Sequence, residues 1–168
     1  GHQPAPMVFA GKVLADVVRL IKGDRYRSRL ISKIMFGAYN KHIKNVRTVN
    51  DWLTRDEAVV DEYNAGKLTT FMFTVNGYRG LMNMILYVRK PRNIERIPKN
   101  LPMLMISGLD DPVGEYGKGV YRAYNSYHGH IDDIDLRLYE DCRHELCNEL
   151  NKEEIYEEIY GWIMNHMS

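Results

Sequence analysis

Apolar residues at helical spacing run through the first part of the chain. They recur about every three to four residues, which is the spacing of one buried helix face. The first set predicts a helix over residues 7–22, with prolines ahead of it and Gly23 after it as a stop signal. This set consists of Val13, Leu14, Val17, Val18 and Ile21.

Further helices are expected before residue 90. An amphipathic stretch predicts a helix over residues 26–36, and residues 40–50 look irregular. Thr54 and Glu57 have the spacing of a capping box, in which each side chain satisfies a free amide at the helix start, and predict a helix to about residue 64. Residues 70–88 are apolar enough for one long buried helix, although Gly77 and Gly80 interrupt the run.

The pattern changes after residue 100 to an alternation of strand-like and helical segments. These segments are a strand at 101–106, a helix at 116–127, a strand at 134–139 and a helix at 152–165. Asn151 and Glu154 are expected to cap the last helix, whose buried face would contain Ile155, Ile159, Trp162 and Ile163. Alternation of this kind indicates a parallel layer and the α/β fold class.

Two residues that follow the predicted strands suggest chemistry. Asp111 lies in the turn Ser107–Gly114 after the first strand, and His144 lies in the loop after the second, 33 residues later. An acid followed by a histidine is the order in which the last two members of an α/β-hydrolase triad occur. No G-x-S-x-G nucleophile motif occurs in the 168 residues, so a serine nucleophile is expected upstream of residue 1.

Each candidate also has a simpler interpretation. Asp111 precedes Pro112, and Asp-Pro is ordinary turn chemistry. His144 between Arg143 and Glu145 could be a solvated surface histidine. Asp110 is expected to be a turn residue. Cys142 and Cys147 flank His144 without a zinc-site spacing, so no metal is expected.

Composition narrows the class of protein. A hydrophobic content of 45% without low-complexity tracts indicates a globular chain. Two cysteines and no secretory segment make a reducing cytoplasm the expected location, without a disulfide framework. No apolar run approaches the roughly 20 residues of a membrane span.

Charge is distributed unevenly along the chain. Residues 19–47 hold nine Lys or Arg and one Asp, whereas residues 131–168 hold eleven Asp or Glu and three Lys or Arg. The basic stretch could contact anionic lipid transiently, because basic amphipathic helices gain from both charge and apolar burial, but a solvated face is the simpler interpretation. The twelve tyrosines of the chain, together with this basic stretch, could suggest nucleic-acid stacking. The acidic C-terminus and the apolar stripe through the same helices argue against it, so nucleic acid is not an expected partner.

Three stretches resemble the C-terminal half of α/β-hydrolases of the monoacylglycerol lipase, lysophospholipase and serine aminopeptidase group. They are LPMLMISGLDDPVGEYGKGV at 101–120, LRLYEDCRHELCNE at 136–149, and residues 39–63 with their core DWLTRD. The resemblance implies a partial α/β-hydrolase fold. In this fold a helical cap, here residues 1–75, precedes the C-terminal part of the core at 76–168, and the N-terminal strands and the nucleophile elbow are absent.

The same resemblance assigns roles to site residues. It implies that Asp111 is the triad acid, because it comes three residues after the glycine at the strand end, and that His144 is the base, with no cofactor. The expected activity of the whole enzyme is cleavage of acyl-lipid esters. Its acyl chain would lie in the cap, with candidate lining residues Met7, Val8, Phe9, Phe71, Met72 and Phe73. Packing in the core is at least as good an interpretation for each of them.

Two interpretations of the chain remain open at the level of sequence. It could be part of a serine hydrolase that is inactive without its nucleophile, or a non-catalytic remnant that acts as a binding module. An apolar strand at 102–107 without its neighbour in the family order predicts pairing with the missing N-terminal half or with a second copy.

Overall fold

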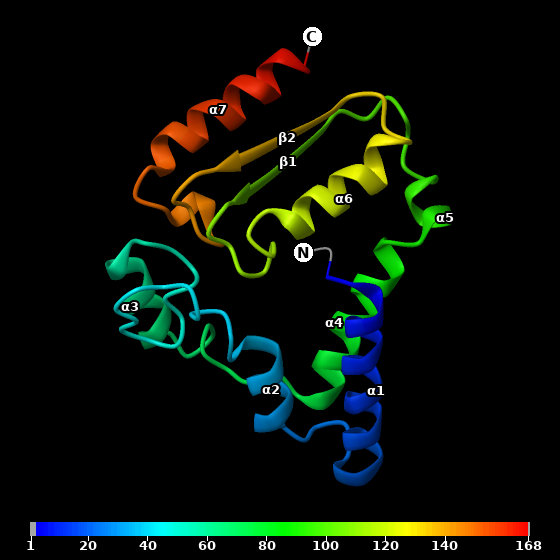
Figure 1. The fold of residues 1–168 in the computed structure, drawn as a ribbon, viewed down its shortest axis with the longest axis vertical. Coiled ribbons are helices and arrows are strands. Elements are labelled where there is room, and N and C mark those ends of the chain that lie inside the picture. The colour runs from blue at the N-terminus through cyan, green and yellow to red at the C-terminus, as the bar shows by residue number, and fades with distance from the viewer. Residues whose placement is uncertain (1–2, 168) are drawn as a thin grey trace.

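The computed structural model describes residues 3–167. Its elements are α1 (Ala5–Lys22), α2 (Arg29–Phe36), α3 (Glu57–Ala65), α4 (Val75–Val88), α5 (Pro91–Ile94), β1 (Met103–Gly108), α6 (Lys118–His128), β2 (Ile134–Tyr139), the 3₁₀ turn η1 (Leu146–Asn148) and α7 (Lys152–Asn165). Helices fill the first half, and a small α/β layer forms the second (Figure 1). The predicted α/β class and partial α/β-hydrolase architecture are confirmed.

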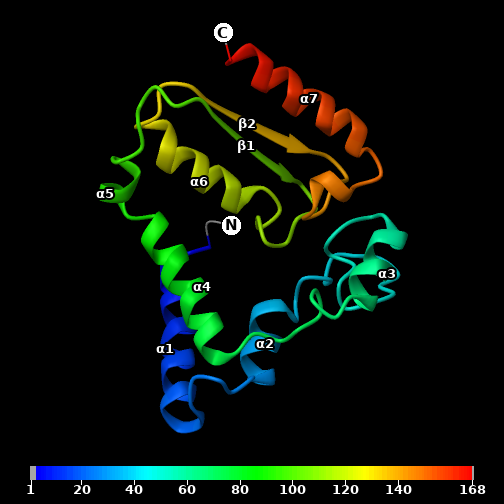
Figure 2. The ribbon, with the colours of Figure 1, turned by 180° about the vertical axis from the view of Figure 1, so that it is seen from behind.

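A first hydrophobic core joins three helices. α1 and α4 lie side by side in both ribbon views, and α2 packs against them (Figures 1 and 2). The buried residues of this core are Val8, Ala15, Ile31, Val75, Tyr78 and Met82. The predicted division of the chain at residue 75 stays a prediction.

The helix predicted at 70–88 is shorter in the structure, where α4 begins at Val75. Thr74 ends the extended segment before it, and its hydroxyl accepts a hydrogen bond from the amide of Gly77. A threonine cap of this kind fixes the helix start. Gly77 and Gly80 lie inside α4 and do not break it.

The two strands of the second half are parallel neighbours. Met103 pairs with Ile134 and Gly108 with Tyr139. β1 begins two residues later than predicted because Pro102 has no amide hydrogen to donate, and the first ladder bond comes from the amide of Met103. α6 and α7 cover opposite faces of this pair: Leu138 faces the start of α6, whereas Tyr139 faces α7.

A second core lies under α7. Its buried residues are Cys142, Leu146 and Ile155, with Ile106, Tyr139 and Ile159 packed against them. Of the predicted buried face, Ile155 is buried, whereas Ile163 is exposed and Trp162 donates its indole N–H to Asp135. Within the described residues, two strands are too narrow a sheet to cover the outer end of α7.

Two predicted helix caps are wrong. Thr54 does not cap α3, because its hydroxyl donates to the carbonyl of Asn148 in the distant histidine loop, and Asp56 accepts from the amides of Ala58 and Val59 instead. Asn151 stands at the start of α7 without a side-chain cap bond. Its oxygen accepts from Arg55, 2.7 Å away. In both cases the side chain that was expected to cap the adjacent helix is hydrogen-bonded to a residue far away in the sequence.

Candidate active site

The parallel pairing of β1 and β2 brings the two predicted site residues together. Loops at the carboxyl ends of parallel strands emerge at the same edge of a sheet. Here the amide of Asp110 donates to the carbonyl of Cys142 at 2.9 Å. Gly108 lies so close to this loop that a Cβ would overlap the backbone carbonyl of Cys142. Gly108 therefore lets the turn that carries Asp111 (residues 107–114, the acid turn) touch the loop after β2 that carries His144 (the histidine loop).

Asp111 is held in a fixed orientation inside its turn. Its Oδ1 accepts from the amide of Val113 at 2.8 Å, and its Oδ2 from the amide of Gly114 at 3.0 Å. The hydroxyl of Ser107 is 3.4 Å from Oδ2. The residue is only 6% exposed. Backbone donors of this kind stabilise a carboxylate and fix its position.

His144 completes the pair. Its Nδ1 lies 3.1 Å from Oδ1 of Asp111, and its side chain is 37% exposed. With Nδ1 engaged by the carboxylate, Nε2 is the ring nitrogen left for a proton transfer. In this arrangement the carboxylate can orient the imidazole and stabilise its charged form, which is what a histidine needs to act as a general base.

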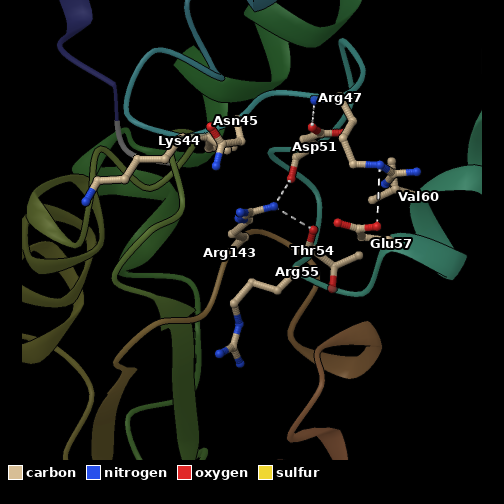
Figure 3. A pocket seen from close by; sticks show the side chains of 10 residues that line it. Lys44, Asn45, Arg47, Asp51, Thr54, Arg55, Glu57, Val60 and Arg143 are labelled. Carbon is tan, nitrogen blue, oxygen red and sulfur yellow. Dashed lines mark hydrogen bonds and ion pairs between the residues drawn. The ribbon is translucent and has the colours of Figure 1, made fainter.

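Three residues near the pair were not assigned roles from the sequence. The ring of Trp52 lies beside that of His144, with centroids 5.1 Å apart. Arg143 donates from Nη1 to the carbonyls of Asp51 and Thr54, at 2.7 and 2.9 Å (Figure 3). Glu149 is fully buried behind the loop. All three lie in the stretches that carry the family resemblance, but their contacts join positions about ninety residues apart, and no local pattern encodes them.

The buried carboxylate of Glu149 has several donors around it. It accepts from the amide of Arg143 at 2.7 Å and from Nε of Arg55 at 2.9 Å. Although partial burial alone would lower the pKa of Arg55, its hydrogen bond to Glu149 raises it. Burial, and then the charge of Glu149, raises the pKa of the Cys142 thiol. Both cysteines are free.

A small polar pocket of about 230 Å³ lies beside the contact of Arg143 with Asp51 and Thr54 (Figure 3). Arg47 and Asp51 contribute to its wall, and Arg47 pairs with Glu57 at 3.5 Å. Burial would raise the pKa of Asp51, but hydrogen bonds from the Thr48 hydroxyl and from the amides of Arg47 and Thr48 lower it overall. Arg47 and Arg55 in this wall are each paired with a carboxylate, whereas Arg143 is bonded to backbone carbonyls.

A larger, mainly apolar cavity of about 660 Å³ lies between the helices α1, α2 and α4 and the turn that carries Asp111. Its wall comes from α1, α2, α4 and the segment Pro112–Tyr116, and includes Leu14, Ile34, Met35, Met82 and Ile85. Among the predicted lining residues, Met7 and Val8 contribute to the wall. Phe9, Phe71 and Phe73 are exposed, and Met72 lies outside the wall.

The acid turn reaches this cavity through a tight backbone segment. Glu115, Tyr116 and Gly117 have positive φ angles of 52°, 55° and 83°. Two non-glycine residues in this region are uncommon and mark a constrained turn. The Tyr116 ring meets His42, which follows α2, edge-on at 4.8 Å. Burial, and then the charges of Asp110 and Asp111, raises the pKa of Tyr116.

Within residues 3–167, no three His, Cys, Asp or Glu side chains gather as metal ligands would. Over the same residues, none of the helices has the length and apolar character needed to cross a bilayer.

Comparison with solved structures supports one fold. The chain is similar to a highly thermostable carboxyl esterase from Bacillus coagulans, in complex with glycerol (21% identity, 97% of this chain and 54% of that one, TM-score 0.87). It is also similar to a lipase in its open form (18%, 98% and 52%, TM-score 0.74). A third is a soluble variant of monoglyceride lipase from Saccharomyces cerevisiae, in complex with a substrate analog (17%, 89% and 51%, TM-score 0.60).

The chain spans about half the length of these three proteins. Comparison with curated protein sequences finds no match. The model of the serine aminopeptidase S33 family matches residues 5–151, which is most of the chain. The expected resemblance to this group is thereby confirmed, and the chain belongs to the serine aminopeptidase S33 family of α/β-hydrolases.

Proposed function

We propose that this chain is the cap and C-terminal part of a serine hydrolase that cleaves carboxylic esters of acyl lipids, as lysophospholipases and monoacylglycerol lipases do. The observation that carries the proposal is the Asp111–His144 hydrogen bond of 3.1 Å at the carboxyl ends of two parallel strands. In the proposed enzyme Asp111 is the triad acid and His144 the general base.

The proposed reaction is acyl transfer to water. A serine from a segment outside these 168 residues attacks the ester carbonyl, and its proton passes to Nε2 of His144. Asp111 holds the imidazole in the required tautomer and stabilises its charged form. His144 then returns the proton to the leaving alkoxide, and a water molecule, activated by the same imidazole, releases the acid and restores the serine.

The apolar cavity supports an acyl substrate over a peptide. Its wall combines aliphatic side chains of the cap with Pro112 and Tyr116, only a few residues from Asp111. An acyl chain in this cavity would gain from the removal of apolar surface from water. We assign residues 1–75 to the cap and 76–168 to the core of the proposed enzyme.

Two partners follow from the proposal besides the ester. The nucleophile would come from an N-terminal half that pairs with the open edge of β1. The cap has apolar side chains exposed on α1, among them Leu20 and Ile21, close to Arg19 and Lys22. These residues would allow a transient contact with an anionic membrane surface.

Intact mass measurement after treatment with a fluorophosphonate probe tests the proposal. The purified chain should be accompanied by an upstream polypeptide that carries the probe on a serine, and hydrolysis of an acyl ester should stop on labelling. Isolation from the native source as a single unlabelled species near 19.7 kDa, with no ester hydrolysis, would favour the non-catalytic binding module instead.

A further inference from the structure

The ring of Trp52 is held between two aromatic rings. On one side it lies against His144, with centroids 5.1 Å apart and planes inclined by 45°. On the other side Tyr39 meets it edge-on at 4.9 Å. Tyr39 in turn meets Phe36 at the end of α2, at 5.7 Å. A row of rings therefore leads from the cap core to the imidazole.

The segment around Trp52 is bound to the segment around His144 by one side-chain and one backbone hydrogen bond. Arg143, which precedes His144, donates to the carbonyl of Asp51, which precedes Trp52, at 2.7 Å (Figure 3). The amide of Glu145, which follows His144, donates to the carbonyl of Leu53, which follows Trp52, at 2.7 Å. The two rings thus stand opposite each other between two hydrogen bonds.

Buried charges reinforce this arrangement from behind. Glu149 accepts from the amide of Arg143 and from the side chain of Arg55, so it ties the histidine loop to the end of the 51–55 segment. Thr54 adds a hydroxyl bond to the carbonyl of Asn148 at 2.7 Å. These bonds fix the backbone that carries Trp52 relative to the backbone that carries His144.

We propose that Trp52 is a positioning residue for His144. The imidazole is 37% exposed, and its Nδ1 is hydrogen-bonded to Asp111. The Trp52 ring packed against it restricts rotation of the imidazole and keeps Nε2 directed towards the reacting groups. The inference rests on the proposed role of His144 as the base.

Fluorescence of Trp52 tests whether the ring contact exists in solution. Trp162 stacks on His166 at 4.1 Å and would give a similar signal, so the chain is used with Trp162→Phe. A protonated imidazole quenches a neighbouring indole. Emission should fall by about twofold between pH 8 and pH 5, the range in which imidazoles titrate.

A matched variant assigns that change to one residue. His144→Gln in the same background should abolish the pH dependence, and it leaves Asp111, Tyr39, Tyr116 and Glu145 in place as the other titratable groups near the two rings. Emission that varies equally with and without His144, or does not vary at all, would overturn the proposed contact.

Exchange of the His144 Nδ1 proton tests positioning. In the histidine-labelled chain, NMR should detect this proton when the bond to Asp111 persists. Trp52→Ala should speed its exchange with water by about tenfold, and Trp52→Phe should restore most of the protection. Trp162→Ala is the control, because its ring contacts His166 instead.

A second variant keeps the test decisive if Trp52→Ala does not fold. Arg143→Lys retains the charge but loses the two-carbonyl contact with Asp51 and Thr54, and should also speed exchange. Unchanged exchange in a folded Trp52→Ala or Arg143→Lys chain would overturn the proposal. None of these measurements needs ester hydrolysis, so their failure is distinct from failure of the proposed function.

Discussion

Glu149 and Arg55 form an ion pair that joins the two halves of the molecule. Their atoms Oε2 and Nε are 2.9 Å apart, and the Glu149 side chain is fully buried while that of Arg55 is 28% exposed. Residue 55 precedes α3, and residue 149 follows the histidine loop. This pair therefore helps to hold the loop that carries His144.

Removal of the Glu149 carboxylate should destabilise the chain. Glu149→Ala leaves Nε of Arg55 and the amide of Arg143 without their acceptor, and should lower the free energy of unfolding by about 3 kcal/mol. A larger loss is not expected, because Arg55 keeps its bond to Asn151 and is reached by water. Glu149→Gln keeps one acceptor oxygen and should cost about 1–2 kcal/mol. Urea unfolding at pH 7 measures both. Glu157→Gln, an exposed change on α7, should change stability by less than about 0.5 kcal/mol.

Asp111→Asn should abolish most activity of the assembled hydrolase. An amide cannot hold the imidazole in the required tautomer or stabilise its charge, so kcat should fall on the order of 10⁴-fold. Hydrolysis of a soluble acyl ester measures it. Asp110→Asn is the matched control, because that residue is exposed in the same turn, and should leave kcat unchanged. Equal losses in both variants would argue for a purely structural turn.

Asp51 should contribute a pH-dependent part of stability. Its pKa in the folded chain lies below the ordinary value of 3.8, so its contribution is present above that value and is lost as pH falls through the lower folded pKa. Asp51→Asn should therefore cost about 1–3 kcal/mol at pH 7, and the difference from the parent should shrink below about pH 4.

Thermal or urea unfolding across pH 2.5–7 measures this difference. Asp61→Asn is the control, since Asp61 pairs with the same Arg47 at 2.7 Å but is exposed, and exposed pairs contribute about 0–1 kcal/mol. A pH-independent loss in Asp51→Asn would show that shape, and not charge, matters at this position.

The apolar cavity beside α1, α2 and α4 should select acyl chain length in the proposed enzyme. Ala38 lies in its wall, so Ala38→Trp should fill part of the volume and lower kcat/KM for laurate relative to butyrate by about tenfold. p-Nitrophenyl esters of both acids measure the ratio in the assembled enzyme. Leu68→Trp adds the same ring at a site that is 88% exposed and should leave the ratio unchanged.

The free edge of β1 should support self-association of the isolated chain. The amides of Met103 and Leu109 bond to β2, so in a parallel ladder the amides of Leu104 and Ile106 point to the opposite edge. Light scattering should therefore detect a dimer that dissociates on dilution. Leu104→Pro removes one outward donor and should give a monomer. A parent chain that is monomeric at high concentration would contradict this expectation.

The elements of the second half were predictable because their signals are local. Alternating strand-like and helical segments placed β2 and α7 at the residues where they occur. The glycine and proline signals around Asp111 marked a turn, and chain order suggested how the acid and His144 could relate. The triad roles themselves came from resemblance and stay proposals.

The helix caps and the contacts around His144 were decided only by the tertiary structure. Thr54 and Asn151 satisfy local capping rules, yet distant partners claim their side chains. Trp52, Arg143 and Glu149 act across about ninety residues, where no spacing in the sequence carries a signal. Sequence by itself determined which residues could cap, pair or bind, because those preferences arise within a few residues. Only the tertiary structure decided which partner each side chain has, because a hydrogen bond to a distant partner in a buried place is stronger than one to a neighbouring residue in contact with water.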